Sequence, residues 1–457
     1  MNFNQINKVY FIGVGGIGMS ALARYFHSQG KDVTGYDKTE TELTKKLIQE
    51  GISVHYDDTA LSVLDQFSHR DTLVVYTPAV PANMGELVAF QEHGFHVIKR
   101  AKALGVISKE FDTYAVAGTH GKTTTSTILA HVLNTTVEKC NAFIGGIASN
   151  YDSNCIINPE SSRVVVEADE FDRSFLNLSP KYAIITSMDA DHLDIYGDGD
   201  QLKVSFNDFV NLIKNTGLLI VNSTIDISKF DIMSDLRIIT YGIDNGSDWK
   251  LHALKYQDGK FYFDIIGFGQ IYRNVEFGLP GQHNAENATA VFALCIELGV
   301  SEVDIRTAFK SFMGVKRRFD FKVRNDQMVV IDDYAHHPTE IDAFLRSVKK
   351  LYVNRKITVV FQPHLFSRTR DFMDAFADAL SLADELYLLP IYPARELQIE
   401  GVTSEVLLDK INMFDKKMSS KEDIIEHLKE NEQEVICILG AGDIDQIVDP
   451  ISKQFCE

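Results

Sequence analysis

The sequence has few cysteines and no long apolar run. Its five cysteines are scattered over 457 residues. None forms a CxxC pair, so the sequence indicates neither a zinc site nor a disulfide framework. No stretch approaches the ~20 apolar residues that a membrane-spanning helix needs. The N-terminus shows no signal-peptide pattern, so we expect a cytoplasmic protein that is not inserted in a membrane.

Positive charge is also scarce. The chain has 45 lysines and arginines against 64 aspartates and glutamates, a formal net charge of −19. This balance argues against general binding to nucleic acids or anionic membranes, because both are negatively charged. Cations that hold an anionic substrate must therefore be gathered locally. The length is enough for about three domains of ~150 residues.

A glycine-rich turn with a lysine lies at residues 118–125. The β-branched and aromatic run Thr113–Val116 precedes it and an apolar pattern with helical spacing follows it, which predicts a strand, a tight turn and a helix start. Such a helix start favours phosphate. Lys122 can reach the outer phosphates and Thr123 can ligate Mg²⁺. Val116 stands where the common phosphate loop has glycine, so this is a shortened variant, with an ordinary βα turn as the alternative.

A second glycine-rich turn lies near the N-terminus. The predicted strand Val9–Ile12 leads into Gly13-Val14-Gly15-Gly16-Ile17-Gly18, a helix is expected from Met19, and the next strand ends at Asp37. This spacing matches the dinucleotide fingerprint, which has an acidic residue about 20 positions on. Spacing alone suggests a nicotinamide or flavin cofactor first. The motif physically provides a diphosphate cradle, however, and a nucleotide sugar would fit it as well.

Acidic residues follow two further predicted strands. The apolar run 163–166 ends at Glu167. The run 182–186 is followed by Asp189, Asp191, His192 and Asp194. Carboxylates at strand ends near a phosphate loop suggest Mg²⁺ ligation, since oxygen ligands suit that ion. A solvated loop is the alternative for each of these acids.

The middle of the chain offers two further polar pairs. Short β-rich runs from about 218 to 278 predict an antiparallel insertion, and a helix follows. Asn284 and Asn287 share one face at the start of that helix and could donate to a nucleotide, although capping would explain one of them. Arg317 and Arg318 precede a new segment and are a candidate phosphate clamp. A solvated surface pair is the alternative.

From about residue 315 the pattern alternates between strands and helices. Four apolar strands end in the polar clusters 332–340, 362–370, 390–396 and 440–444. Open parallel sheets bind small molecules at the carboxyl ends of their strands. Four such clusters on successive strands therefore predict a binding site.

Together these motifs resemble the Mur ligase family, the ATP-dependent amide-forming enzymes of peptidoglycan precursor synthesis. The resemblance covers essentially the whole chain and rests on segments 118–124, 167–170, 191–194, 281–288, 317–319 and 332–334. Within the family, segments 13–20, 336–340, 362–364 and 367–370 are most similar to members that join L-alanine to UDP-N-acetylmuramate.

The resemblance implies an α/β fold of three domains. These are a Rossmann-like UDP-sugar-binding domain (1–109), a P-loop ATPase-type ATP-binding domain with the antiparallel insertion (110–313), and a Rossmann-like domain (314–457) that closes over ATP and carries the amino-acid pocket. The first fingerprint would then hold a UDP-sugar rather than NAD. The implied substrates are UDP-N-acetylmuramate, L-alanine and ATP with Mg²⁺, and the implied state is a monomer or homodimer.

The resemblance also implies roles for residues at matching positions. The expected catalytic residues are Lys122, Glu167, His192 and Arg318, and the expected metal ligands are Thr123, Glu167 and His192. The expected ATP-binding residues are Gly118, Thr119, His120, Gly121, Lys122, Thr123, Thr124, Asn284, Asn287, Arg318 and Asp333. The UDP-sugar would lie on Gly13, Gly15, Gly16, Gly18, Met19, Ser20 and Asp37. The amino acid would lie on His336, Arg368 and Arg370.

Two positions depart from the family pattern. Asn207 stands where other members carry a carbamylated lysine and Lys203 is out of register, so no carbamate is assigned. Arg395 follows the expected pattern only loosely.

Three rival activities stay open: a recycling ligase that adds a preformed tripeptide to the same UDP-sugar, a folylpolyglutamate-synthase-like ligase, and a nicotinamide oxidoreductase. The second would not need the N-terminal domain, and the third would leave the phosphate loop without a role.

Overall fold

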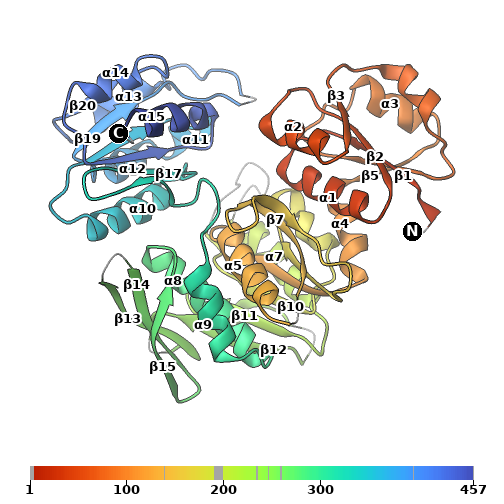
Figure 1. Cartoon of the computed structure of the whole chain (residues 1–457), viewed down its shortest axis with the longest axis horizontal. Helices are drawn as coiled ribbons and strands as arrows, with labels where there is room; N and C mark the ends of the chain where they lie inside the picture. The colour runs from red at the N-terminus through yellow and green to blue at the C-terminus, as the bar shows by residue number, and fades with distance from the viewer. Residues whose placement is uncertain are drawn as a thin grey trace. The chain divides into compact units, whose positions relative to one another are not determined.

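The computed structural model describes residues 5–137, 139–189, 199–232, 235–244, 246–257, 260–394 and 396–455. The chain divides into two units. The first comprises Met1–Ala253, Tyr262–Phe277 and Glu286–Met313, and the second comprises Leu254–Phe261, Gly278–Ala285 and Gly314–Glu457. Three sheets of five, ten and six strands confirm the predicted three-domain α/β architecture (Figure 1). The boundaries at 109 and 313 stay predictions.

The first sheet is wholly parallel, with the strand order β3-β2-β1-β4-β5. Its strands are β1 (Lys8–Ile12), β2 (Asp32–Tyr36), β3 (Ser53–His55), β4 (Thr72–Tyr76) and β5 (His96–Lys99). The chain winds outward from β1 to β3 and then returns to the other side of β1 with β4. This reversal creates a ligand-binding crevice at the carboxyl end of β1, where the fingerprint turn lies.

Alternate residues of β1 point to opposite faces of this sheet. Phe11 packs in a core with α1 (Ile17–Ser28) and α4 (Arg100–Lys109), whereas Tyr10 packs in another with η2 (Ala60–Gln66) and α3 (Gly85–Glu92). Helix α1 begins two residues before the predicted Met19.

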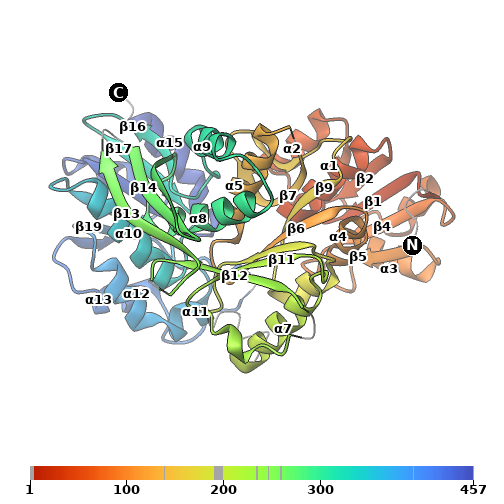
Figure 2. The same cartoon turned by 90° about the horizontal axis from the view of Figure 1, so that it is seen from below.

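The second sheet has the order β15-β14-β13-β12-β11-β10-β6-β9-β7-β8. Its central strands are β6 (Asp112–Ala117), β9 (Arg163–Glu167) and β10 (Tyr182–Ile185), and β7 (Asn141–Ala148) and β8 (Ser153–Ile156) follow on one side. Both neighbours of β6 are parallel to it. Helices α5 (Lys122–Thr135) and α7 (Gly199–Asn211) cover opposite faces (Figure 2). The winding reverses at β6 too, which places a second crevice at the phosphate loop.

The antiparallel insertion is narrower than the sequence suggested. Strands β11 (Leu218–Asn222) and β12 (Arg237–Gly242) continue the parallel ladder from β10, and residues 249–250 of the following strand pair with β12 in parallel too. The prediction was therefore wrong for this part. The direction of a strand depends on its pairing with strands distant in sequence, which a local pattern does not record, and this explains the error. The later strands are β13 (Trp249–Gln257), β14 (Lys260–Gly267) and β15 (Gln270–Phe277). Two residues join β14 to β15, a link that only antiparallel strands permit.

The third sheet belongs to the second unit and has the order β16-β17-β21-β18-β19-β20. Its strands are β16 (Asp320–Arg324), β17 (Val329–Asp333), β18 (Ile357–Phe361), β19 (Glu385–Leu388), β20 (Lys416–Met418) and β21 (Val435–Leu439). Only β16 is antiparallel to its neighbour. One face packs on α10 (Pro338–Leu351), α12 (Met373–Leu380) and α13 (Ser404–Lys410), and the other on α14 (Ile424–Lys429) and α15 (Val448–Gln454).

Three further helices are α8 (Gln282–Glu297), α9 (Glu302–Ser311) and α11 (Phe366–Asp371). Within the described ranges, no helix combines the length and the apolar character needed to cross a membrane.

Candidate active site

The phosphate loop has the predicted strand, turn and helix, with α5 beginning at Lys122. Gly118 and Gly121 adopt φ values of 137° and 81°, which only glycine tolerates easily. A Cβ on Gly118 would lie 2.1 Å from the Thr186 hydroxyl oxygen. The His120 N–H donates to Ser187 Oγ at 2.8 Å, which pins the outer part of the loop to the end of β10. The turn is therefore held in shape by the protein itself.

The other expected members of this loop lie close by. Thr119 shares a hydrogen bond with Ser187, their hydroxyl oxygens being 2.9 Å apart, and Thr124 is buried in the first turn of α5. Asn287 lies against the loop, since a Cβ on Gly121 would be 3.1 Å from Asn287 Oδ1. Asn284, the third residue of α8, instead donates its Nδ2 to the Pro280 carbonyl at 2.6 Å, which ties the start of the helix to the preceding segment but is not an N-cap.

Lys122 is paired inside the protein. Its Nζ donates to the Gly118 carbonyl at 2.7 Å and to Glu170 Oε1 at 2.9 Å. Burial lowers the pKa of Lys122, but the neighbouring carboxylates, Glu170 foremost, outweigh it and raise the pKa overall. Glu170, whose side chain is completely buried, was not among the predicted site residues. The sequence could have indicated Glu170, because it belongs to the acidic segment 167–170 that follows a predicted strand.

Glu167 lies beside the hydroxyl at the start of α5. Its Oε1 accepts a hydrogen bond from Thr123 Oγ1 at 3.0 Å, and its Oε2 accepts one from the Gly145 N–H at 2.9 Å. Burial raises the pKa of Glu167, and the charge of Lys122 opposes this only in part. A Cβ on Gly145 would lie 2.4 Å from Glu167 Oε2, so glycine makes room for the carboxylate.

The donor set of Thr123 and Glu167 fits Mg²⁺. That ion usually takes one or two carboxylates and completes its shell with substrate phosphates and water. No cluster of three His, Cys, Asp or Glu side chains that could hold a metal occurs in the described part of the chain. The predicted residues Asp191, His192 and Asp194 lie outside the described residues.

The fingerprint turn is organised by its own acidic residue. The Gly15 N–H donates to Asp37 Oδ2 at 2.7 Å, and a Cβ on Gly15 would lie 2.8 Å from the same oxygen. Gly13, at φ 86°, begins the turn, and Gly16 is the N-cap of α1. Asp37 thus fixes the backbone that would cradle a diphosphate.

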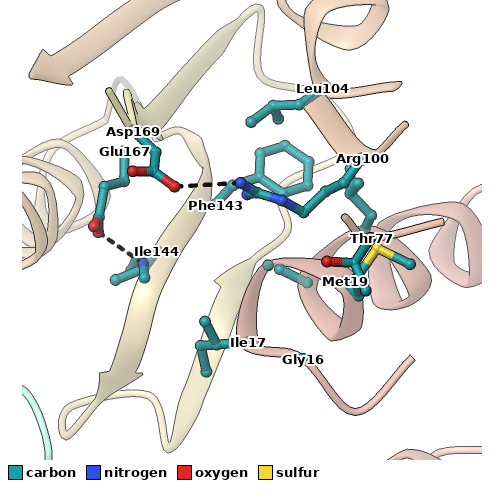
Figure 3. A pocket seen from close by; sticks show the side chains of 14 residues that line it. Gly16, Ile17, Met19, Thr77, Arg100, Leu104, Phe143, Ile144, Glu167 and Asp169 are labelled. Carbon is teal, nitrogen blue, oxygen red and sulfur yellow. Dashed lines mark hydrogen bonds and ion pairs between the residues drawn. The ribbon is translucent and has the colours of Figure 1, made fainter. Parts of the chain in front are cut away.

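One cavity of about 300 Å³ joins the fingerprint turn to the acidic strand end (Figure 3). Gly16, Gly18 and Met19 line it on one side, and Glu167 and Asp169 line it on the other. Thr77, directly after β4, lines it as well. Sequence reasoning missed the lining residues Arg100, Phe143 and Gly145. Phe143 and Gly145 lie within β7 and Arg100 begins α4, and no motif singles them out.

Ser20 does not line this cavity. It is fully buried, and its hydroxyl accepts a hydrogen bond from Asn154 Nδ2 at 2.9 Å. This residue therefore fastens α1 to β8 rather than facing a ligand.

In the second unit, the two adjacent arginines behave differently. Arg317 donates to the Gly440 carbonyl at 2.6 Å and lies 3.6 Å from Asp332, which makes it part of the framework. The Arg318 guanidinium lies 5.0 Å from the centre of the Tyr334 ring, a cation–π contact. It makes no ion pair with any residue that the structure describes, and so stays available for a ligand.

Asp333 holds the turn that carries Arg318. Its Oδ2 accepts from the Phe319 N–H at 2.6 Å and its Oδ1 from the Ala335 N–H at 2.8 Å. Burial raises the pKa of Asp333 to about 6, although Arg318 opposes the shift.

His336 belongs to a small aromatic cluster at neighbouring strand ends. Its ring centre lies 6.0 Å from that of His364, which in turn stacks on Tyr392 at 5.7 Å. Burial lowers the pKa of each histidine to about 4, so both rings are neutral at neutral pH. The charge of Arg368 adds to the effect of burial on both pKa values.

Arg370 does not join that cluster. It is exposed, and its Nε donates to the neighbouring Asp371 at 2.7 Å. Two residues apart on the short helix α11, Arg368 and Arg370 face different surroundings. Arg395 lies outside the described residues.

Sequence profiles of three domains match successive parts of the chain. They are described as "Mur ligase family, catalytic domain" (residues 8–112), "Mur ligase middle domain" (116–295) and "Mur ligase, glutamate ligase domain" (317–442).

Similar proteins cover the whole chain. The UDP-N-acetylmuramate–L-alanine ligases of Flavobacterium johnsoniae and Flavobacterium psychrophilum are 46% and 48% identical, each over 100% of both chains. The crystal structure of a UDP-N-acetylmuramate-alanine ligase from Thermotoga maritima has a TM-score of 0.83 at 29% identity, and the match covers 98% of this chain and 99% of that one. With three matching domains in order and relatives this similar over their full length, the chain belongs to the Mur ligase family.

Proposed function

We propose that this chain joins L-alanine to the lactyl carboxylate of UDP-N-acetylmuramate, converting ATP to ADP and phosphate, in peptidoglycan precursor synthesis. The observation that carries this proposal is the cavity that opens at once on the fingerprint turn and on Glu167 of the phosphate-loop region. The full-length relatives at 46–48% identity bear the name of this activity.

The shape of that cavity suits a UDP-sugar whose carboxylate must meet ATP. A diphosphate fits the N-terminal end of α1, where unpaired N–H groups and the helix dipole favour anions. The sugar would then extend across the cavity towards Glu167, whose Oε1 accepts a hydrogen bond from the Thr123 hydroxyl of the phosphate loop. This arrangement supports a UDP-sugar that reaches from the fingerprint turn to Glu167, next to the loop assigned to ATP. A nicotinamide cofactor alone would leave the phosphate loop without a role.

The reaction needs an activated carboxylate, because oxide is a poor leaving group at neutral pH. Transfer of the γ-phosphoryl group of ATP to the carboxylate gives an acyl phosphate, the alanine amine attacks its carbonyl carbon, and phosphate leaves. The protein contributes positioning and stabilisation of developing negative charge. We assign the β- and γ-phosphates to Lys122 and the backbone of residues 118–124.

Thr123 and Glu167 would hold Mg²⁺, and His192 would lie near a second ion. Bound Mg²⁺ neutralises charge on the transferring phosphoryl group. Arg318 and Asn287 are assigned to the nucleotide, while Asp333 supports the Arg318 turn and Asn284 the start of α8. The substrates, ATP above all, are cytoplasmic, and on that ground we place the enzyme there.

His336 and Arg368 are the proposed amino-acid residues. A guanidinium can take the alanine carboxylate in a bidentate manner, and neutral imidazoles beside it add no competing charge. Arg368→Ala should raise the KM for L-alanine by roughly 10- to 100-fold, the loss of a charged hydrogen-bonded contact. Arg370→Ala is a matched control that removes the same charge from the same helix and should leave this KM almost unchanged.

The deciding experiment measures ADP release with UDP-N-acetylmuramate and ATP while the amino donor is varied among L-alanine, glycine, L-serine and L-Ala-γ-D-Glu-diaminopimelate. L-Alanine should give the highest kcat/KM. Glycine and L-serine should be used slowly, because one methylene is worth only ~1–3 kcal/mol in a pocket. A preference for the tripeptide would identify the recycling ligase instead.

Calorimetric titration tests the cofactor rival. The proposal requires binding of UDP-N-acetylmuramate and none of NAD(H) at matched concentration. Tight binding of NAD(H) without a response to the UDP-sugar would overturn the assignment of the first domain.

A further inference from the structure

Arg100 is the one cationic side chain among the described residues that line the active-site cavity. It is the first residue of α4, at the end of the first sheet, and its side chain is 24% exposed. The chain is acidic overall, so a cation inside the proposed substrate cavity is a candidate contact for an anionic group of the substrate.

The start of α1 is shaped around this arginine. A Cβ on Gly18 would lie 2.7 Å from Arg100 Nη1 and 3.1 Å from Arg100 Cδ. The last glycine of the fingerprint thus leaves space for the Arg100 side chain, which lies across the first turn of α1. The guanidinium thereby lies beside Gly18 in the first turn of α1, the segment whose backbone N–H groups would receive a diphosphate.

The contact with Asp169 uses only one of the hydrogen-bond donors of Arg100. Arg100 Nη2 lies 3.4 Å from Asp169 Oδ2, longer than the ~2.7–2.9 Å typical of a charged hydrogen bond. Arg24 in the same domain shows the contrast, since its Nε and Nη2 reach both oxygens of Glu50 at 2.6 and 2.9 Å. A guanidinium has five N–H donors. Within the part of the chain that the structure describes, Asp169 is the one hydrogen-bond acceptor of Arg100, so most of its donors are free to bind a ligand in the cavity.

We propose that Arg100 binds the diphosphate of the UDP-sugar, adding a side-chain cation to the backbone N–H groups of α1. This inference rests on the proposed function, because it takes its ligand from there. Asp169 holds the guanidinium in position at the edge of the cavity, and the diphosphate recruits the remaining donors. The contact is made equally in the ground state and the transition state, so it contributes to substrate binding rather than to the chemical step.

The test is calorimetric titration of wild type, Arg100→Ala, Arg100→Lys and Lys99→Ala with UDP, UDP-N-acetylglucosamine and UDP-N-acetylmuramate. Arg100→Ala should weaken all three by the same factor, about 10-fold or more, because a charged contact to phosphate is lost. Arg100→Lys should recover part of the affinity, since lysine binds phosphate as a point charge. Lys99→Ala is the control: it removes a charge from the adjacent, more exposed residue, whose Nζ lies 3.3 Å from Asp172 outside the cavity.

Steady-state kinetics give a second readout that a purely structural role would not produce. In Arg100→Ala the KM for UDP-N-acetylmuramate should rise while kcat and the KM values for ATP and L-alanine stay near those of wild type. Thermal unfolding of each variant checks that it is folded.

Three outcomes count against the inference. Unchanged affinity in Arg100→Ala overturns it, and so does a loss confined to UDP-N-acetylmuramate, which would assign Arg100 to the lactyl carboxylate, the group that UDP-N-acetylglucosamine lacks. If wild type itself binds none of the three ligands, the proposed function fails together with this inference. If wild type and Arg100→Ala bind the ligands with equal affinity, this inference fails but the proposed function stands.

Discussion

The two glycine-rich turns of the first unit have the same local build but different electrostatics. Each follows a parallel strand at which the winding of its sheet reverses, and each opens a helix. The phosphate loop contains its own cation, Lys122, which a buried carboxylate holds in place. The fingerprint turn contains none, and its Gly15 N–H is held by the carboxylate of Asp37.

This difference suggests that one turn serves to bind an anion and the other to stabilise an anion that reacts. Backbone N–H groups at a helix start are sufficient to favour a phosphate. A preorganised charge inside a water-poor loop stabilises a transferring phosphoryl group, because it needs no reorganisation during the reaction. The fingerprint turn is thus suited to binding, and the phosphate loop to catalysis.

Removing the cation from the phosphate loop should have the largest effect. Lys122→Ala should lower the rate of ADP release by on the order of 10³-fold or more. It should also destabilise the fold by about 3–5 kcal/mol, because the ion pair between Lys122 and the buried Glu170 is broken. Activity assays and chemical denaturation measure the two losses separately.

The double variant Lys122→Met with Glu170→Gln is the control for that result. It removes both charges and should regain most of the stability without regaining the rate. A folded single variant with near-normal turnover would contradict the catalytic role of Lys122.

Replacing one glycine of each turn by alanine should destabilise the protein much more at the phosphate loop than at the fingerprint turn. Gly118→Ala places a Cβ at φ 137° and 2.1 Å from the Thr186 hydroxyl, so it should cost ~1–3 kcal/mol from backbone strain and more from the clash. Gly16→Ala meets its nearest neighbour only at 3.6 Å and should change stability by less than ~0.5 kcal/mol. Its new methyl group would enter the cavity, so the KM for the UDP-sugar should rise. Equal melting temperatures for the two variants would contradict this reading of the turns.

Neutralising Glu167 should weaken Mg²⁺ binding at the phosphate loop without affecting ligand binding at the fingerprint turn. Glu167→Gln should raise the Mg²⁺ concentration needed for half-maximal activity by at least roughly 10-fold, as loss of metal-site groups generally does. Calorimetric affinity for UDP should stay the same. An unchanged Mg²⁺ titration would reject Glu167 as a ligand.

The pH dependence offers a further check on the same residue. Because burial raises the pKa of Glu167, its carboxylate takes up a proton at a higher pH than an ordinary glutamate does. Protonation removes the metal-binding charge, so the Mg²⁺ requirement of wild type should rise as the pH falls below neutrality. Glu167→Gln should show a flatter dependence over the same range.

The smallest effect is expected at the acid of the fingerprint turn. Asp37→Asn keeps an oxygen that can accept from the Gly15 N–H, and loses only the added strength of a charged acceptor. We expect a loss of about 1 kcal/mol, seen as a several-fold higher KM for the UDP-sugar with kcat preserved. A fall in kcat without a change in KM would show that this turn also takes part in the chemistry.

Local sequence determined much of the fold. The β-branched and aromatic run before Gly118 and the apolar pattern with helical spacing after it predicted β6 and α5. Such features depend on backbone preferences within a few residues, which the sequence carries directly. The parallel direction of β11 and β12 escaped prediction, because pairing depends on strands distant in sequence.

The sequence by itself determined that this chain has two glycine-rich turns between a strand and a helix, acids that follow strands, and the arginine pair Arg368 and Arg370. Only the tertiary structure decided which side chains share a cavity: Arg100 and Gly145 enter it, Ser20 is buried away from it, and Arg370 points to solvent where Arg368 does not. Motifs fix the chemistry of short segments through local geometry. The meeting of segments about seventy residues apart, as for Arg100 and Asp169, depends on the packing of whole sheets and helices, which no local pattern records.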